Sequence, residues 1–433
     1  MWFLLFILVG CCLSLPSEPR RQPIPQSDIV PSLSIPGVEF RRARPFSDTP
    51  KASLARKGGK HAKLKRLPQS PSHRLPSAAA FFAEHLQFDV VPGIFPTGNV
   101  SVVDHSATQY SVEVVLDGSP VNLILDTAGS DTWVRSRNFT CLNNVTEPAS
   151  RSQCDWGKFG ATGFPNGPIQ DQHFTIRNAD GSGVSGQLGY MDVSLANVAV
   201  HNQEVAIATQ GTWHGDNITS VINLRLSIRP LFTTMVTDGL VEPYWSLAIS
   251  RNSSDGLFCL GALPPAVNRS QNHRQGDLLI ANLANKNFAA YQPSYYATIF
   301  DGFKIGNIDI IESLPLILDS ATTLAYLPPD VAEIVNNHFR PAATYLWDYG
   351  SYFVPCDATP PRFAVMLQNS PFEINPKDMI KHDVVHPSTG MCQTGITTGA
   401  SGPYVLGLTF LTNVVVGFDI GGGLIEVIAR EYY

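Results

Sequence analysis

Two aspartates in this 433-residue chain stand in nearly the same local sequence. The run Leu123–Ala128 (LILDTA) returns as Leu316–Ala321 (LILDSA), so that Asp319 follows Asp126 by 193 positions. Each copy is an apolar strand that ends in an aspartate where the chain turns. One copy alone is typical of an Asx turn. Two copies indicate an internal repeat in which each half of the chain contributes one carboxylate.

Two carboxylates that meet across a pseudo-twofold axis have a defined chemistry. Because like charges a few ångströms apart cannot both ionise, the pair holds one proton at acidic pH. The ionised carboxylate can take a proton from water while the protonated one hydrogen-bonds a scissile carbonyl. The repeat therefore predicts hydrolysis by an activated water, and this reaction needs no metal and no cofactor.

Short strands dominate the sequence that must position these aspartates. From about residue 85, apolar or alternating runs recur at a spacing of roughly ten residues, separated by Gly, Pro, Asn and Asp. Strands are predicted at 109–116, 120–125, 198–207, 314–318 and 414–420, and a helix with prolines at its start is predicted at 328–339. We expect an all-β fold with a few short helices, arranged as two lobes.

The motifs around both aspartates resemble those of the pepsin-like aspartic peptidases. Asp126–Val134 (DTAGSDTWV) is similar to the first catalytic motif of that family, and Asp319–Thr323 (DSATT) is similar to the second. Val405–Asp419 is similar to the run near the family's carboxyl end, and Asp180–Asp192 to the flap, a hairpin that closes over substrate. The resemblance covers about residues 85–430 and implies a bilobal double β-barrel with the active-site cleft between the lobes.

The resemblance also implies an activity, acid endopeptidase, with Asp126 and Asp319 as the catalytic pair. Substrates would be proteins or peptides, with apolar side chains preferred beside the cut, and the enzyme would be a monomer with no nucleic-acid partner. The residues expected to support the catalytic loops or contact substrate are Thr127, Ala128, Ser320, Ala321, Thr322, Asn178, Asp180, Gly181 and Ser182.

Five positions depart from the family pattern. Ala128 and Ala321 stand where the family has Gly, and Gly129 replaces a Ser whose hydroxyl bonds the first aspartate. Asn178 stands where the flap has Tyr, and Asn223 where a Gly is expected behind the first loop. These departures leave an alternative, a catalytically inactive protein of this fold that binds a peptide, glycan or enzyme partner in its cleft.

The amino-terminal part differs in composition from the rest. Residues 1–16 have the apolar core of a signal peptide, and Cys11 also fits a bacterial lipoprotein box, although no Lys or Arg precedes it. Residues 17–66 are Pro-rich and contain 12 basic and 4 acidic residues, a net charge of +8, whereas the remainder has 18 basic and 32 acidic residues, a net charge of −14. We interpret 17–66 as a prosegment that masks the acidic body. It would be released by cleavage near Lys65-Arg66 or somewhat later, up to about residue 85; the alternative is a disordered arm that binds polyanions.

The expected organisation is thus a signal peptide, the prosegment, an N-terminal lobe at 85–285 and a C-terminal lobe at 286–433. No later apolar stretch is long enough to cross a membrane, so we expect a secreted protein, or a vacuolar one that uses the same pathway. Cys141 with Cys154 and Cys356 with Cys392 would each close a short disulfide loop, as the resemblance also implies, and Cys259 would be a buried free thiol. Glycosylation is expected at Asn99, Asn138, Asn144, Asn217, Asn252 and Asn268.

Overall fold

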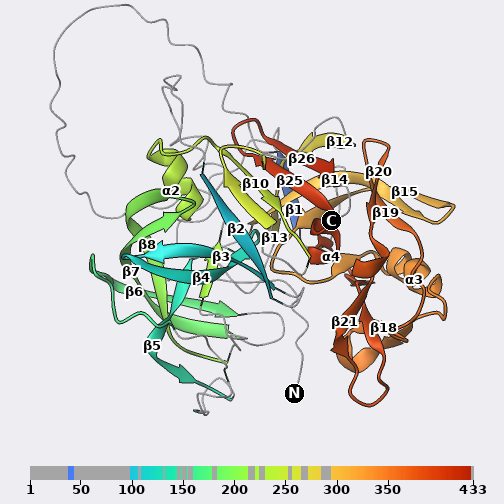
Figure 1. The fold of residues 1–433 in the computed structure, drawn as a ribbon, viewed down its shortest axis with the longest axis horizontal. Helices are drawn as coiled ribbons and strands as arrows, with labels where there is room; N and C mark the ends of the chain where they lie inside the picture. Colours follow the sequence, from blue (N-terminus) through green and yellow to red (C-terminus); the bar gives the residue numbers. More distant parts are fainter. Residues whose placement is uncertain are drawn as a thin grey trace, which may run out of the picture.

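The structure, a computed structural model, describes residues 38–42, 98–105, 109–129, 132–143, 148, 154, 159–177, 183–212, 220–223, 230–251, 256–264, 272–283 and 294–430. The predicted signal peptide and the Lys65-Arg66 site lie outside these residues. Strands predominate in the described parts, with short helices between them (Figure 1). The all-β prediction is confirmed.

The largest sheet has thirteen strands. Their order is β12 (His273–Asp277), β26 (Leu424–Ala429), β25 (Val414–Asp419), β10 (Tyr244–Ala248), β11 (Gly256–Leu260), β2 (Gly98–His105), β3 (Gln109–Leu116), β4 (Ser119–Asp126), β9 (Ser220–Asn223), β5 (Trp133–Cys141), β8 (Val198–Gly211), β7 (Gly183–Leu195) and β6 (Pro168–Arg177). Strands from the last twenty residues of the described chain therefore extend a sheet built mainly by the first half, because β25 pairs with β10.

A second sheet has nine strands. Its main order is β1 (Val38–Arg42), β13 (Leu279–Leu283), β14 (Ser294–Ile305), β15 (Ile308–Leu318), β24 (Val405–Leu406), β16 (Ala325–Leu327) and β23 (Ile396–Thr398), and β19 (Phe363–Leu367) joins β14 to β20 (Ser370–Ile374). Strand β1, which belongs to the predicted prosegment, pairs with β13 at the edge of this sheet.

The remaining elements are a small sheet and five helices among the described residues. The sheet has the order β17 (Thr344–Leu346), β18 (Ser351–Val354), β22 (Cys392–Thr394) and β21 (Ile380–Val385). The helices are α2 (Leu231–Thr237), α3 (Pro329–Asn337), α4 (Leu408–Leu411) and the 3₁₀ turns η4 (Trp347–Tyr349) and η5 (Pro376–Asp378). In Figure 1 the cyan and green strands lie on one side and the orange strands on the other, with β10 and β25 between them.

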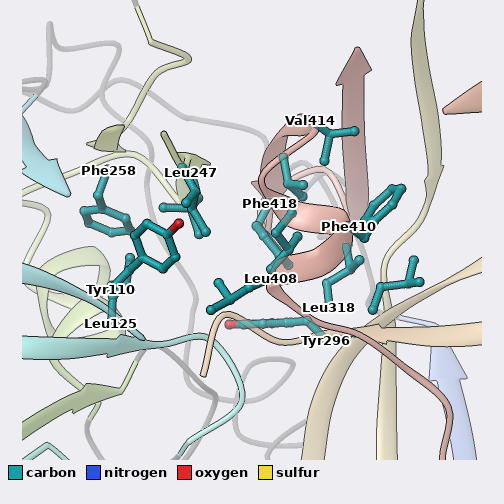
Figure 2. Close-up of a cluster of buried hydrophobic side chains, with 14 of the residues drawn as sticks. Tyr110, Leu125, Leu247, Phe258, Tyr296, Leu318, Leu408, Phe410, Val414 and Phe418 are labelled. Carbon is teal, nitrogen blue, oxygen red and sulfur yellow. The ribbon is translucent and has the colours of Figure 1, made fainter. Parts of the chain in front are cut away.

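One large core continues from one half into the other. Figure 2 shows side chains of β3, β4, β10 and β11 facing side chains of β14, β15, α4 and β25. Trp245 on β10 stacks on Phe418 of β25 with ring centroids 3.9 Å apart. Leu125 and Leu318, the residues before the two repeated aspartates, are both fully buried in this core. The core thus fixes the end of each aspartate-bearing strand.

The predicted elements agree with the observed ones most closely where the apolar pattern is strong. Strand β3 covers 109–116 as predicted, and helix α3 begins one residue later and ends two residues earlier than predicted. Strand β15 is longer than predicted and starts at Ile308 instead of residue 314. Its first half is mostly exposed and is held by backbone pairing with β14, so a buried apolar pattern does not mark it.

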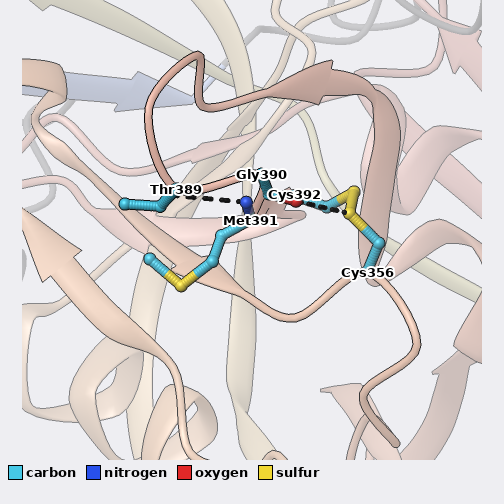
Figure 3. The surroundings of a disulfide bond; sticks show 5 residues. All are labelled: Cys356, Thr389, Gly390, Met391 and Cys392. Carbon is cyan, nitrogen blue, oxygen red and sulfur yellow. Dashed lines mark hydrogen bonds between the residues drawn. A yellow bond between two sulfur atoms is a disulfide. The ribbon is translucent and has the colours of Figure 1, made fainter.

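Both predicted disulfides are present. Cys141 is bonded to Cys154, and Cys356 to Cys392 (Figure 3). Cys259 is a free, buried cysteine with 3% of its surface exposed, as predicted. In the described part of the chain, we find no helix with the length and apolar character needed to cross a membrane.

Candidate active site

The two aspartate loops are built in the same way. Strand β4 ends at Asp126, and its last residues pair in parallel with β9, with Asp126 opposite Asn223. Strand β15 ends one residue before Asp319, and its last residues pair in parallel with β24. The amide of Asp319 donates to the carbonyl of Leu406 on β24 at 3.1 Å. Each aspartate is therefore held beside a second strand of its own half.

Thr127 and Ser320, the residues after the aspartates, bind the two loops to each other. The Thr127 hydroxyl donates to the carbonyl of Leu318 at 2.9 Å and accepts the Ser320 amide at 3.0 Å. The Ser320 hydroxyl donates to the carbonyl of Leu125 at 2.7 Å and accepts the Thr127 amide at 3.1 Å. All four bonds are buried and reciprocal. They bring together two chain segments about 190 residues apart, and their exchange of equivalent bonds relates the loops of Asp126 and Asp319 by a local twofold pattern.

Each carboxylate accepts hydrogen bonds from its own loop. Asp126 Oδ1 accepts the amides of Ala128 and Gly129, both at 2.7 Å. Asp319 Oδ1 accepts the amide of Ala321 at 2.8 Å, and its Oδ2 accepts the Thr322 hydroxyl at 2.6 Å. The two loops are similar but not identical, because a hydroxyl donates to Asp319 where Gly129 offers only its amide to Asp126.

The two aspartates differ in burial. Asp319 is 3% exposed, and its burial raises the pKa of its carboxyl, against the opposing effect of hydrogen bonds from Thr322 and Ala321. Asp126 is only partly buried. Tyr326 lies close enough for the charge of Asp319 to contribute to its raised pKa, although burial is the main cause. Burial therefore disfavours the ionised form of the Asp319 carboxyl.

A family model described as Eukaryotic aspartyl protease matches residues 109–429, which include both loops and the strands that hold them. The chain belongs to the eukaryotic aspartyl protease family. A probable aspartic-type endopeptidase of Aspergillus fumigatus is 33% identical over 342 residues, covering 72% of this chain and 76% of its own length. Aspergillopepsin-1 of Aspergillus clavatus is 25% identical over 336 residues, 75% of this chain and 79% of its own. Rhizopuspepsin-4 of Rhizopus niveus is 26% identical over 348 residues, which cover 76% of this chain and 79% of its own length.

The alanines that depart from the family's motifs do not break the hydrogen bonds of either loop. Ala128 is 7% exposed and packs in a cluster with Leu324 and Tyr326, while its amide still donates to Asp126. The amide of Ala321 does the same for Asp319. In both lobes of this aspartyl protease family member, the loop amide thus keeps its hydrogen bond to the aspartate despite the added methyl group.

The strands behind the two loops differ in the residue that lies level with each aspartate. A Cβ on Gly407, which follows β24, would overlap the backbone oxygens of Thr322 and Leu324. Only glycine fits there without moving the Asp319 loop. In the first half, the strand register places Asn223 beside Asp126. The first half therefore has Asn223 at the position where the second half has Gly407, which is the departure noted in the sequence.

Other predicted site residues have mixed outcomes. Strands β6 and β7 form the hairpin of the predicted flap and pair up to Arg177 and Gly183, but its tip, with Asn178, Asp180, Gly181 and Ser182, lies outside the described residues. Of the sequon asparagines, Asn99 and Asn138 are exposed, and the other four lie outside the described residues. The described residues contain no cluster of His, Cys, Asp or Glu that could hold a metal ion.

Sequence reasoning missed a buried polar cluster behind the Asp319 loop, which contains Arg251, Asp378, Thr412 and Asn413. Arg251 and Asp378 are 127 residues apart in sequence. No local periodicity marks such a pair, because its members come from a loop after β10 and from the turn η5.

Proposed function

We propose that this protein is an acid endopeptidase in which Asp126 and Asp319 share one proton and activate a water molecule. The reciprocal bonding of Thr127 and Ser320 is the observation that carries the proposal, because it joins the two aspartate loops about a local twofold axis. Family membership supports peptide bonds as the substrate class.

The different surroundings of the two carboxyls support a division of roles. Asp319, whose pKa burial raises, holds the shared proton and donates it in a hydrogen bond to the scissile carbonyl. Asp126 accepts two backbone amides, which stabilise its ionised form. As a carboxylate it takes a proton from the attacking water. The tetrahedral intermediate then collapses as the leaving nitrogen receives a proton from the pair.

We further propose that the protein enters the secretory pathway and is made as an inactive precursor. Residues 1–16 would be removed as a signal peptide, and the basic segment 17–66 would cover the acidic body until low pH weakens their attraction. The two lobes would then be 85–285 and 286–433. Pairing of β1 with β13 supports an association between the prosegment and the body. Extracellular or vacuolar activity would follow.

The test is hydrolysis of a denatured protein substrate at about pH 3 to 5, where one shared proton is expected. Asp126→Asn and Asp319→Asn should each reduce kcat by a factor on the order of 10³ or more, and a statine-type transition-state mimic should inhibit the unchanged enzyme. Asp309→Asn is the matched control, since Asp309 lies on the exposed first half of β15, where its side chain is 59% exposed and paired with Lys304.

The competing function, a binding protein that does not cleave, gives a different result. The processed wild-type protein would then bind peptide without hydrolysing it, and Asp126→Asn would leave binding unchanged. Hydrolysis that the mimic does not inhibit, or that survives Asp126→Asn, would also overturn the peptidase proposal.

A further inference from the structure

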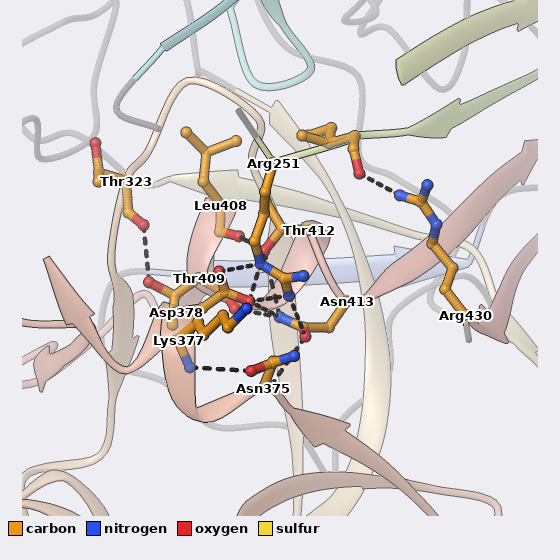
Figure 4. Close-up of polar contacts among 11 residues, drawn as sticks. Arg251, Thr323, Asn375, Lys377, Asp378, Leu408, Thr409, Thr412, Asn413 and Arg430 are labelled. Carbon is orange, nitrogen blue, oxygen red and sulfur yellow. Dashed lines mark hydrogen bonds and ion pairs between the residues drawn. The ribbon is translucent and has the colours of Figure 1, made fainter. Parts of the chain in front are cut away.

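A buried ion pair joins the two halves of the chain behind the Asp319 loop. Arg251 follows β10 in the first half, and Asp378 ends η5 in the second. Arg251 Nε donates to Asp378 Oδ1 at 2.5 Å, and its Nη2 contacts Oδ2, a two-pronged arrangement (Figure 4). The side chains are 12% and 8% exposed. Such geometry fixes the orientation of both groups as well as their separation.

The polar atoms around this pair are further satisfied by Asn413 and Thr412. Asp378 Oδ2 accepts Asn413 Nδ2 at 2.7 Å, and it lies 3.2 Å from the Thr412 hydroxyl, whose one hydrogen is shared between this oxygen and the carbonyl of Leu408. Arg251 Nη2 also donates to Asn413 Oδ1 at 2.9 Å. Buried charges are costly unless they are paired and hydrogen-bonded. Few other positions of these side chains would therefore keep both charges paired. The carboxylate of Asp378 therefore holds Asn413 in place and contacts the Thr412 hydroxyl.

These two residues in turn hold the one-turn helix α4. The Thr412 hydroxyl donates to the carbonyl of Leu408 at 2.9 Å, and Asn413 Nδ2 donates to the carbonyl of Thr409 at 3.0 Å. A helix of four residues has too few internal hydrogen bonds to be stable alone. Its position is consequently set by the core packing of Leu408, Phe410 and Leu411 together with the groups that bond its ends.

The other end of α4 bonds the Asp319 loop. The amide of Leu408 donates to the carbonyl of Thr322 at 2.7 Å. The amide and the hydroxyl of Thr409 both donate to the carbonyl of Thr323 at 3.0 Å. Thr322 is the residue whose hydroxyl bonds Asp319 Oδ2 at 2.6 Å. The ion pair is thus connected to the buried carboxyl by hydrogen bonds and by the residues of α4 and Thr322 that lie between them.

We propose that Arg251 and Asp378 are positioning residues for the buried aspartate: their ion pair, acting through Thr412, Asn413 and α4, fixes the orientation of Thr322 toward Asp319. This inference rests on the proposed peptidase function. The ion pair also ties the first half of the chain to the second at this point.

The experiment compares Arg251→Met with the matched control Arg362→Met. Arg362 forms an exposed pair with Glu373, with side chains 78% and 46% exposed. Arg251→Met should lower kcat by about 10- to 100-fold with KM changed less than about twofold, since a small misplacement of a reacting group costs about this much. Inhibition by a statine-type mimic should weaken in proportion to kcat/KM. Arg362→Met should change neither.

A conservative variant separates positioning from folding. Arg251→Lys keeps the positive charge but cannot form the two-pronged bond. It should therefore fold, and its kcat should fall by less than that of Arg251→Met. If a folded Arg251→Met or Arg251→Lys keeps the wild-type kcat, or if only KM changes, the inference is wrong. An inactive wild-type protein would instead overturn the proposed function, and this inference with it.

Discussion

At the scale of single residues, the site depends on two hydroxyls as much as on two carboxyls. Thr127 and Ser320 each use one oxygen as donor and acceptor at once, to a carbonyl and an amide of the other loop. A hydroxyl is the smallest side-chain group that can do both. The requirement for Thr or Ser after each aspartate is therefore structural, and it is separate from the chemistry of the aspartates.

Thr127→Val tests this role. The variant keeps the shape of the side chain but leaves the Ser320 amide and the Leu318 carbonyl without partners in a buried place, which should lower the free energy of unfolding by about 2 to 4 kcal/mol. Urea denaturation at neutral pH measures it. Thr127→Ser keeps the hydroxyl and should cost much less. A loss below about 0.5 kcal/mol for Thr127→Val would show that the bonds between the loops contribute little.

Lys381 is a buried amine whose charge is costly. It is 9% exposed, and burial lowers its pKa to about 8, with Arg251 acting in the same direction and Asp378, Asp104 and Asp383 opposing. Because the unfolded chain has a lysine pKa of about 10.4, it binds more protons than the folded chain between these values. The free energy of unfolding should therefore rise with pH across that window.

Lys381→Met removes the titrating group and should abolish this rise. Below about pH 8 the variant should be more stable than wild type by up to about 3 kcal/mol, and the difference should shrink as the pH approaches 10. Urea denaturation at several pH values measures both curves. A difference between the proteins that is constant over this range would contradict the assignment.

At the scale of elements, each aspartate is presented by the same unit, a buried strand that ends beside a parallel neighbour. The two copies differ in the segment after that neighbouring strand. Strand β24 leads through Gly407 into α4, whose amides bond the loop. In the first half, Asn223 stands at the end of β9 opposite Asp126. The sequence repeat is thus reproduced in the aspartate-bearing strands, whereas the segments that follow the neighbouring strands β9 and β24 differ.

Gly407→Ala should disrupt the second unit. The added methyl group would overlap the carbonyl oxygens of Thr322 and Leu324, which are backbone atoms and cannot turn away. We expect a loss of about 1 to 3 kcal/mol in the free energy of unfolding, and loss of hydrolytic activity. Gly163→Ala is the matched control, because no atom lies within 4 Å of its added Cβ. Wild-type activity in Gly407→Ala would mean that the loop can shift at no cost.

At the scale of the whole molecule, the halves are not independent. The sheet of thirteen strands takes β25 and β26 from the end of the chain and pairs β25 with β10, and Trp245 stacks on Phe418 across that pairing. We therefore expect the two halves to unfold together.

Phe418→Ala tests this coupling. Removing a fully packed ring should cost about 3 to 5 kcal/mol, and far-UV circular dichroism and tryptophan fluorescence should report the same, lowered urea midpoint. Ile311→Ala, at a side chain that is 90% exposed, should change stability by less than about 0.5 kcal/mol. Two separate transitions, with only one of them shifted, would show that the halves unfold independently.

The sequence alone determined the features that depend on local pattern and on repetition. The two LILD runs, the strand periodicity of 109–116 and the proline-led helix α3 each carry their signal in consecutive residues. The pairing of Cys141 with Cys154 and of Cys356 with Cys392 joins cysteines close in sequence, 13 and 36 residues apart.

The tertiary structure decided how the two aspartate loops are bound to each other, which aspartate is buried, and which groups support its loop from behind. The bonds of Thr127 with Ser320 and of Arg251 with Asp378 join residues 193 and 127 positions apart. Each member of such a pair looks like an ordinary polar residue in its own segment. Only burial, which removes water as an alternative partner, gives these contacts their strength, and burial is a property of the assembled chain.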